Sequence, residues 1–171
     1  MTVKSKPPVH IDVVVTVQEG ISRSAEANKL RTRAERMIAA LGLANVEVSL
    51  ALVDDAVIRQ LNKRWRRKDK ATDVLSFPML EVPVADIYKA TKASAVLLGD
   101  IVVSVPTANR QAKTHKKAPM DEMTTLVAHG LLHLLGFDHK SDDQEREMDA
   151  YVKVLEAAAG NKKPLRLRLS P

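Results

Sequence analysis

Cysteine is absent from this chain of 171 residues, and aromatic residues make up only 3% of it. Without cysteine the protein has no disulfide framework, no thiolate metal site and no cysteine nucleophile, so a transition metal must be held by histidine, aspartate or glutamate. No stretch approaches the roughly 18 to 20 unbroken apolar residues of a membrane span. Residues 1–8 are polar, contain two prolines and carry no apolar secretory core. We therefore expect a cytoplasmic protein with no membrane partner.

The length fits one hydrophobic core, because a chain of this size buries roughly 70% of its unfolded surface. Lys and Arg number 27 against 21 Asp and Glu, which gives a net charge of +6 and a sequence pI of about 9.6. A basic balance favours polyanionic partners where the charge is clustered. The positions of the basic residues therefore decide what the charge means.

Hydrophobic periodicity predicts an α+β fold. Alternation of apolar residues predicts strands at 9–17, 46–53, 74–77 and 97–105. Apolar spacing of three and four predicts helices at 22–41, 106–115 and 119–135. A further helix is predicted after Asp54, which caps it, and its inward-facing apolar stripe ends at Trp65. The last predicted helix begins after Ser141 and ends at Gly160. Residues 81–95 have no clean period, so we expect a long loop there, with at most a helical turn.

These elements predict a single domain in which a small mixed β-sheet of about four strands packs against about five or six helices. The domain spans residues 9–160. A flexible N-terminal extension at 1–8 and a basic C-terminal tail at 161–171 flank it.

Three of the five histidines lie within the eleven residues His129-Gly130-Leu131-Leu132-His133-Leu134-Leu135-Gly136-Phe137-Asp138-His139. On a helix, His129 and His133 project within about 40° of each other, one turn apart. Gly136 is suited to end this helix, so that the chain bends His139 back toward the first two rings. Three neutral imidazoles with an open fourth position are typical of a catalytic zinc site. We therefore predict a metal site on a helix and the turn after it, with one Zn²⁺ or another divalent transition metal on His129, His133 and His139.

Gly130 separates this segment from the zinc-protease pattern H-E-x-x-H-x-x-G-x-x-H, which it otherwise matches. The protease has a glutamate at this position, and that glutamate accepts the proton of the attacking water. A glycine cannot accept it, which moves the interpretation away from peptide hydrolysis. The remaining histidines, His10 and His115, have no such spacing, and we treat them as surface or strand residues, with His115 as a further candidate for phosphate contact.

Positive charge is concentrated in Lys63-Arg64-Trp65-Arg66-Arg67-Lys68-Asp69-Lys70, which holds six Lys or Arg in eight residues. Such a run neutralises phosphates, although a solvated helix end also favours Lys and Arg. Trp65 continues the apolar stripe of its helix, so we expect it in the core rather than as a base-stacking surface. The candidate nucleic-acid contacts are Lys63, Arg64, Arg66, Arg67 and Lys68.

Three long motifs occur in order along the chain. They are Leu61-Asn62 through Arg66 with Lys68-Asp69-Lys70 and Thr72-Asp73-Val74-Leu75-Ser76-Phe77-Pro78, then Leu98-Gly99-Asp100-Ile101-Val102, then the histidine segment. In this order and spacing they resemble the bacterial YbeY family of rRNA maturation factors, over roughly residues 9–160.

The resemblance implies a metal-dependent, single-strand-specific endoribonuclease that acts in 16S rRNA 3′-end maturation, rRNA processing and quality control of 70S ribosomes. By motif position, His129, His133 and His139 would be the zinc ligands, and Arg66 would complete the catalytic set as the functional arginine that faces the metal pocket. The implied partners are rRNA, the small ribosomal subunit and ribosome-assembly proteins.

Two alternatives stay open: a zinc metallopeptidase with an unconventional general base, and a non-enzymatic ribosome-assembly factor with a structural metal. The general base or acid is also open. Asp73, Asp100, Glu122 and Asp138 are each compatible with a place near the metal, and none is assigned as catalytic.

Overall fold

The structure, a computed structural model, describes residues 10–21, 24–138, 140–160 and 167. Strands and helices alternate there through the fourth strand, which three successive helices follow. The elements are β1 (Ile11–Val17), α1 (Ser24–Ala40), β2 (Val46–Val53), α2 (Asp55–Arg66), β3 (Val74–Pro78), α3 (Val84–Ala93), β4 (Val96–Ser104), α4 (Val105–Thr114), α5 (Pro119–Leu134) and α6 (Asp142–Gly160). The predicted extension at 1–8 lies outside the described residues, as does the predicted tail apart from Leu167. Within the described residues, four strands and six helices confirm the predicted α+β domain.

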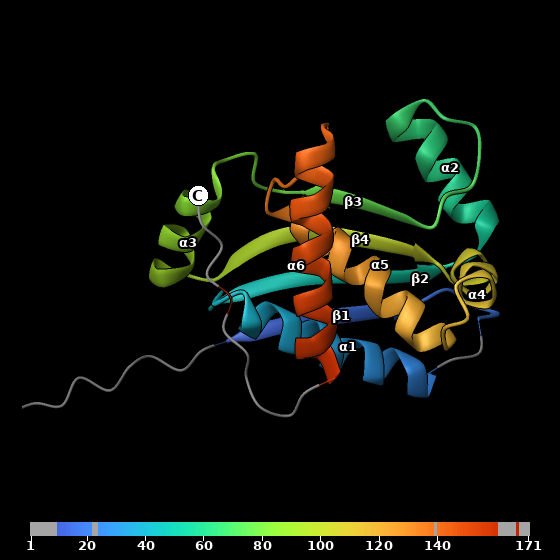
Figure 1. Ribbon diagram of the computed structural model, residues 1–171, viewed down its shortest axis with the longest axis horizontal. Helices are drawn as coiled ribbons and strands as arrows, with labels where there is room; N and C mark the ends of the chain where they lie inside the picture. The colour runs from blue at the N-terminus through green and yellow to red at the C-terminus, as the bar shows by residue number, and fades with distance from the viewer. Residues whose placement is uncertain (1–9, 22–23, 139, 161–166, 168–171) are drawn as a thin grey trace, which may run out of the picture.

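The four strands form one mixed sheet with the order β1-β2-β4-β3 (Figure 1). Strands β1, β2 and β4 are parallel, and β3 pairs antiparallel with β4 at the edge. Parallel neighbours need a crossover connection, which α1 provides between β1 and β2. Side chains alternate between the two faces of the sheet along each strand, so every strand contributes one row of side chains to each face.

One face of the sheet is covered by α1, α5 and α6 (Figure 1). Helices α1 and α5 both pack on the sheet, and α6 packs against both of them, so α5 has the sheet on one side and helices on others and its side chains are buried around most of its circumference. The main core between these layers includes side chains that are at most 1% exposed: Leu30, Met37, Leu50, Ile101, Met123 and Leu131. The helix that carries two predicted metal ligands is therefore the most enclosed element of the fold.

The opposite face of the sheet is covered in part by α2. Val53, Ile58, Leu75 and Val102 form a small second core there. Helix α2 begins where the sequence predicted, because the Asp54 carboxylate accepts a hydrogen bond from the Val57 N–H at 2.8 Å. Towards β1 this face remains open, since Val14 is 51% exposed.

Helix α3 contradicts the prediction of a long loop at 81–95. It is held by tertiary contacts rather than by a long apolar stripe: Ile87 and Thr91 are buried, and the Tyr88 hydroxyl donates to the carbonyl oxygen of Leu41 at 2.5 Å. A helix of ten residues shows too few apolar repeats to be recognised from spacing alone.

In the predicted tail, Leu167 donates its N–H to the carbonyl oxygen of Ala40 at 2.6 Å and packs against the main core. Among the helices that the structure describes, none is both long and apolar enough to cross a membrane.

Candidate functional site

The last two turns of α5 carry two of the predicted metal ligands. His129 and His133 lie one turn apart on this helix, and both are partly buried. The helix ends at Leu134, and Gly136 then turns the chain with a φ of 87°, a conformation that favours glycine. The predicted third ligand, His139, lies outside the described residues.

The ring of His133 is oriented by the turn that follows the helix. Its Nδ1 lies 2.9 Å from the backbone carbonyl oxygen of Phe137. A carbonyl oxygen only accepts hydrogen bonds, so Nδ1 carries the proton, and the lone pair of the neutral ring is on Nε2. Metal-binding histidines commonly donate their second ring nitrogen in this way. His133 therefore fits a zinc ligand that binds through Nε2.

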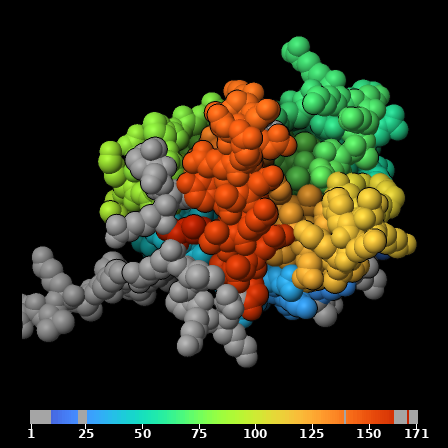
Figure 2. Space-filling model, in the orientation of Figure 1, coloured from blue at the N-terminus to red at the C-terminus, as the bar shows by residue number. Residues whose placement is uncertain are grey.

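A cleft of about 620 Å³ lies beside His133. It is formed by the C-terminal end of α2, by β3 and by the turn after α5, and Figure 2 shows it as a hollow between α6 and α2. Arg66, the last residue of α2, lines the same cleft and donates from Nη2 to the carbonyl oxygen of Ser76 at 3.3 Å. The fold thus brings Arg66 and His133, which are far apart in the sequence, to one cavity.

His129 lines a separate cavity of about 80 Å³, together with the α6 residues Glu145, Met148 and Asp149. Within the part of the chain that the structure describes, no group of three or more histidines and carboxylates lies close enough to hold a metal ion. The three-histidine centre therefore stays a prediction, which depends on His139.

The four carboxylates considered from the sequence lie at different places. Asp138 lines the cleft, and its Oδ2 is 3.2 Å from Nζ of Lys140. Asp73 precedes β3, where its Oδ1 accepts from the Val74 N–H. Asp100 lies in β4 and lines a groove separate from the cleft. Of these three carboxylates, Asp138 is the one at the cleft.

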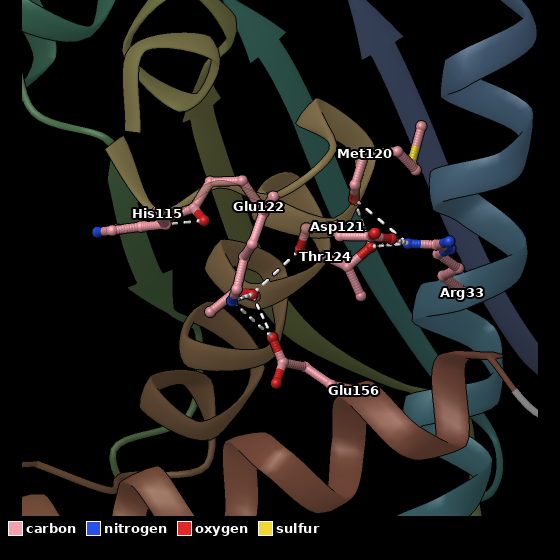
Figure 3. A network of polar contacts seen from close by, with 9 residues as sticks. Arg33, His115, Met120, Asp121, Glu122, Thr124 and Glu156 are labelled. Atoms are coloured by element: carbon pink, nitrogen blue, oxygen red, sulfur yellow. Dashed lines mark hydrogen bonds and ion pairs between the residues drawn. The ribbon is translucent and has the colours of Figure 1, made fainter. Parts of the chain in front are cut away.

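The fourth carboxylate, Glu122, belongs to a set of contacts that holds the N-terminal half of α5 (Figure 3). Its side chain is 4% exposed and lies 3.0 Å from Nδ1 of His115, so this ring nitrogen faces a carboxylate. Arg33 of α1 donates to Oδ1 of Asp121 at 2.8 Å and to Oγ1 of Thr124 at 2.7 Å. These contacts fix α5 against α1 and α4, and so they support the position of the two histidines from a distance.

Gly130 lies where α5 packs on β4. A Cβ atom at this position would lie 2.8 Å from Cγ2 and 3.0 Å from Cδ1 of Ile101, whose side chain is fully buried. In a close-packed interior no larger side chain fits there without movement of the helix. This packing excludes the glutamate that zinc proteases carry at this position, in agreement with the glycine found here.

The basic segment, residues 63–70, is shaped by a buried asparagine that the sequence analysis did not single out. Arg67 adopts a left-handed conformation with φ 57° and ψ 27°, and its N–H donates to the carbonyl oxygen of Asn62. The Asn62 side chain is buried and donates from Nδ2 to the carbonyl oxygen of Lys70 at 2.8 Å. A polar residue beside the apolar stripe of α2 was the signal that could have identified Asn62.

Some charges of the basic segment are paired and others are not. Asp69 accepts from Lys63 at 2.9 Å and from Arg59 at 2.8 Å, and these two hydrogen bonds lower the pKa of its carboxyl group. No ion pair with any described residue is formed by Arg64, Arg67, Lys68 and Lys70. Lys68 and Lys70 line the cleft together with Arg66, so unneutralised positive charge faces it.

Trp65 corrects the prediction of a core residue, because it is 59% exposed. The first turns of α2 cover the sheet through Ile58, whereas Trp65 in the last turn contacts Phe77 of the edge strand and borders an open groove over the sheet. Its ring meets Phe77 edge to face, with 6.2 Å between the ring centroids, and the guanidinium carbon of Arg64 lies 5.3 Å from the centroid of its ring.

Comparison with known proteins adds independent evidence. A family model described as Endoribonuclease YbeY matches residues 13–159. The chain is 48% identical over 138 residues to "Endoribonuclease YbeY" of Anaeromyxobacter sp. (strain Fw109-5), and the match covers 81% of this chain and 67% of the relative. It is 39% identical over 163 residues to the protein of the same name from Azorhizobium caulinodans, and this match covers 93% of this chain and 98% of the relative.

The solution structure of TM1509 from Thermotoga maritima is similar in fold, with a TM-score of 0.59 and 28% identity over 88% of this chain and 89% of the other. Some relatives are much longer than this protein. The chain spans 67%, 46% and 65% of the length of three relatives from Anaeromyxobacter and Myxococcus.

Proposed function

The chain belongs to the YbeY family, and from this premise we propose that it is a zinc-dependent endoribonuclease that cuts single-stranded RNA. We propose 16S rRNA 3′-end maturation, rRNA processing and ribosome quality control as its setting, with rRNA, the small ribosomal subunit and assembly proteins as partners. The names of the relatives support the endoribonuclease activity. For this chain, the observation that carries the proposal is the cleft shared by Arg66 and His133.

Phosphodiester cleavage needs stabilisation of the charge that develops on the phosphate, and Arg66 is suited to this role. Its guanidinium offers two parallel donors to two phosphate oxygens. The present hydrogen bond to Ser76 is 3.3 Å long, beyond the usual range for N–H···O bonds. Little is therefore lost when the guanidinium turns from Ser76 to a phosphate.

Lys68 and Lys70 extend the positive surface along the same cleft. They are suited to neutralise the phosphates on either side of the one that Arg66 binds, which aligns the strand without reading its sequence. RNA affinity should therefore decrease with salt, by about 0.7 in the log–log slope for each phosphate contacted on a single strand.

His129, His133 and His139 would hold the zinc ion, which when bound would polarise a phosphate oxygen or lower the pKa of water. The bond from His133 Nδ1 to the Phe137 carbonyl holds the proton on that nitrogen and keeps the lone pair on Nε2. Asp138 brings a carboxylate to the cleft, where it is suited to accept a proton from the attacking hydroxyl.

The test measures metal content and cleavage of a single-stranded RNA in parallel. We expect His133→Ala to lose both, and Arg66→Ala to keep its metal while cleavage falls by about 10²- to 10³-fold, as for the loss of one charge-stabilising donor. Arg59→Ala is the matched control, because Arg59 lies on the same helix, is paired with Asp69 and does not line the cleft. A metal-free sample that cleaves RNA at the full rate would refute the proposal.

The same samples decide between the alternatives. If the protein cleaves an unfolded protein and His133→Ala loses this cleavage, the result would favour a peptidase, although the packing of Gly130 leaves no room for the usual base. RNA binding without cleavage by the metal-loaded protein would favour a non-enzymatic assembly factor.

A further inference from the structure

A second groove, of about 450 Å³, lies on the face of the sheet opposite α5. We name it the aromatic groove after its outer wall, which consists of Trp65, Phe77 and Met79. Trp65 and Met79 are 59% and 53% exposed, although both are large apolar side chains. Contiguous exposed apolar surface on a soluble domain commonly marks a binding site.

The aromatic groove and the cleft share a wall. Trp65 and Arg66 are consecutive in α2, so their side chains project about 100° apart, Trp65 into the groove and Arg66 into the cleft. Ser76 and Phe77 are consecutive in β3, where side chains alternate between faces, and they line the cleft and the groove respectively. A ligand that lies across the end of α2 and β3 would therefore contact both.

The charges around the aromatic groove suit the base of a nucleotide rather than its phosphate. Asp100 lines the groove, and its carboxylate forms no hydrogen bond or ion pair with any described residue, so it would repel a phosphate there. Positive charge borders the groove at Arg64, whose guanidinium carbon lies 5.3 Å from the ring centroid of Trp65 and which forms no ion pair with a described carboxylate. The arrangement is an apolar groove with a cationic margin.

We propose that the aromatic groove binds one unpaired nucleobase, stacked on Trp65, of the RNA strand whose phosphates lie in the cleft. The proposal rests on the function proposed above, because that function places the strand beside Arg66. Single-stranded RNA is generally bound in this way, with bases stacked on aromatic side chains and the backbone along a positive groove. The groove would then act as a subsite that holds the strand in register for cleavage.

The protein contains one tryptophan, so its tryptophan fluorescence reports on Trp65 alone. We would titrate the protein, with a chelator present to prevent cleavage, with a short single-stranded oligoribonucleotide and with an abasic phosphodiester strand of equal length and charge. We expect the oligoribonucleotide to quench the fluorescence at saturation and the abasic strand to leave it unchanged. Equal quenching by both strands, or none by either strand at saturation, would overturn the proposal.

Affinities of three variants, measured by anisotropy with the same oligoribonucleotide, complete the test. We expect Trp65→Ala to bind about fivefold more weakly or worse, as for the loss of one stacked base, and Trp65→Phe to stay within about twofold of the wild type. Leu97→Ala is the control, because Leu97 is 45% exposed but does not line the groove. Unchanged RNA affinity in Trp65→Ala would refute the base site. This includes the outcome in which Trp65→Ala loses the binding of a partner protein but still binds RNA as the wild type does.

Because binding is measured without cleavage, the two proposals can fail separately. Base-dependent quenching by a protein that never cuts RNA, with or without metal, would keep the base site and reject the endoribonuclease. Metal-dependent cleavage that is unchanged in Trp65→Ala, together with no base-dependent quenching, would keep the endoribonuclease and reject the base site.

Discussion

A methyl group at position 130 would measure how tightly the histidine-bearing helix packs on the sheet. Helix propensity alone would make Gly130→Ala stabilising by about 1 kcal/mol. The new Cβ would however lie 2.8 Å from Cγ2 of the fully buried Ile101, and overpacking of this kind costs about 1–3 kcal/mol. We therefore expect a net destabilisation of about 1 kcal/mol, observed as a lower urea midpoint with an unchanged m-value.

A double-mutant cycle tests the cause of this loss. Ile101→Ala removes the obstructing atoms and should cost about 2–5 kcal/mol by itself, but in its presence Gly130→Ala should become stabilising. Gly160→Ala is the control, since a Cβ there meets nothing within 4 Å. If Gly130→Ala were stabilising by the full propensity value, or if the two changes were additive within about 0.5 kcal/mol, the close contact would not exist as described.

The same variant links the packing to the proposed metal centre. Gly130 directly follows His129 and lies one turn from His133, so a shift of α5 displaces both rings together. We expect the zinc affinity of Gly130→Ala to fall by about tenfold, as for the loss of an orienting contact, and Ile101→Ala to restore part of it. An unchanged affinity would separate the position of α5 from metal binding.

Two further predictions concern α2. Asn62→Leu removes the hydrogen bond to Lys70. It should lower the free energy of unfolding by about 1–2 kcal/mol, as measured by urea denaturation, and weaken the binding of single-stranded RNA, as measured by anisotropy. Unchanged RNA affinity would show that the basic segment keeps its shape without this side chain. Hydrogen bonds from the Val57 N–H and from Gln18 lower the pKa of Asp54 from 3.8, so its stabilising contribution is complete above that value and is lost as the pH falls through the lower folded-state pKa. Asp54→Asn keeps an N-cap without the charge, so its urea midpoint should fall less than that of the wild type below about pH 4, and equal falls would contradict this reasoning.

Elements with strong local patterns could be predicted from the sequence. Strand β2 has the predicted bounds, 46–53, and α5 differs from the predicted 119–135 by one residue. In both cases the signal is local, because alternation or helical spacing runs the full length of the element and α5 has Pro119 at its start and Gly136 just after its end. Helix α3 was missed because its stability depends on a bond to Leu41, more than forty residues earlier.

The exposure of Trp65 shows a different limit of prediction from the sequence. The stripe that contains Ile58 and Trp65 has the correct helical spacing, and Ile58 is indeed buried. Spacing gives the direction in which a side chain projects from its helix, but it does not tell whether the space beneath the side chain is filled. Only the packing of α2 on the sheet shows that Trp65 borders an open groove instead of a filled core.

The sequence by itself determined the α+β class, the spacing of the histidines on one helix, the glycine that removes the protease base and the clustering of positive charge. These are local properties, set by residue types and by the periods of helix and strand. Only the tertiary structure decided that Arg66 and His133 share a cleft, that Gly130 packs on Ile101, that Asn62 shapes the basic segment and that Trp65 is exposed beside the cleft. The cleft and the contact between Gly130 and Ile101 join segments far apart along the chain, and the surroundings of Asn62 and Trp65 are set by how α2 packs on the sheet.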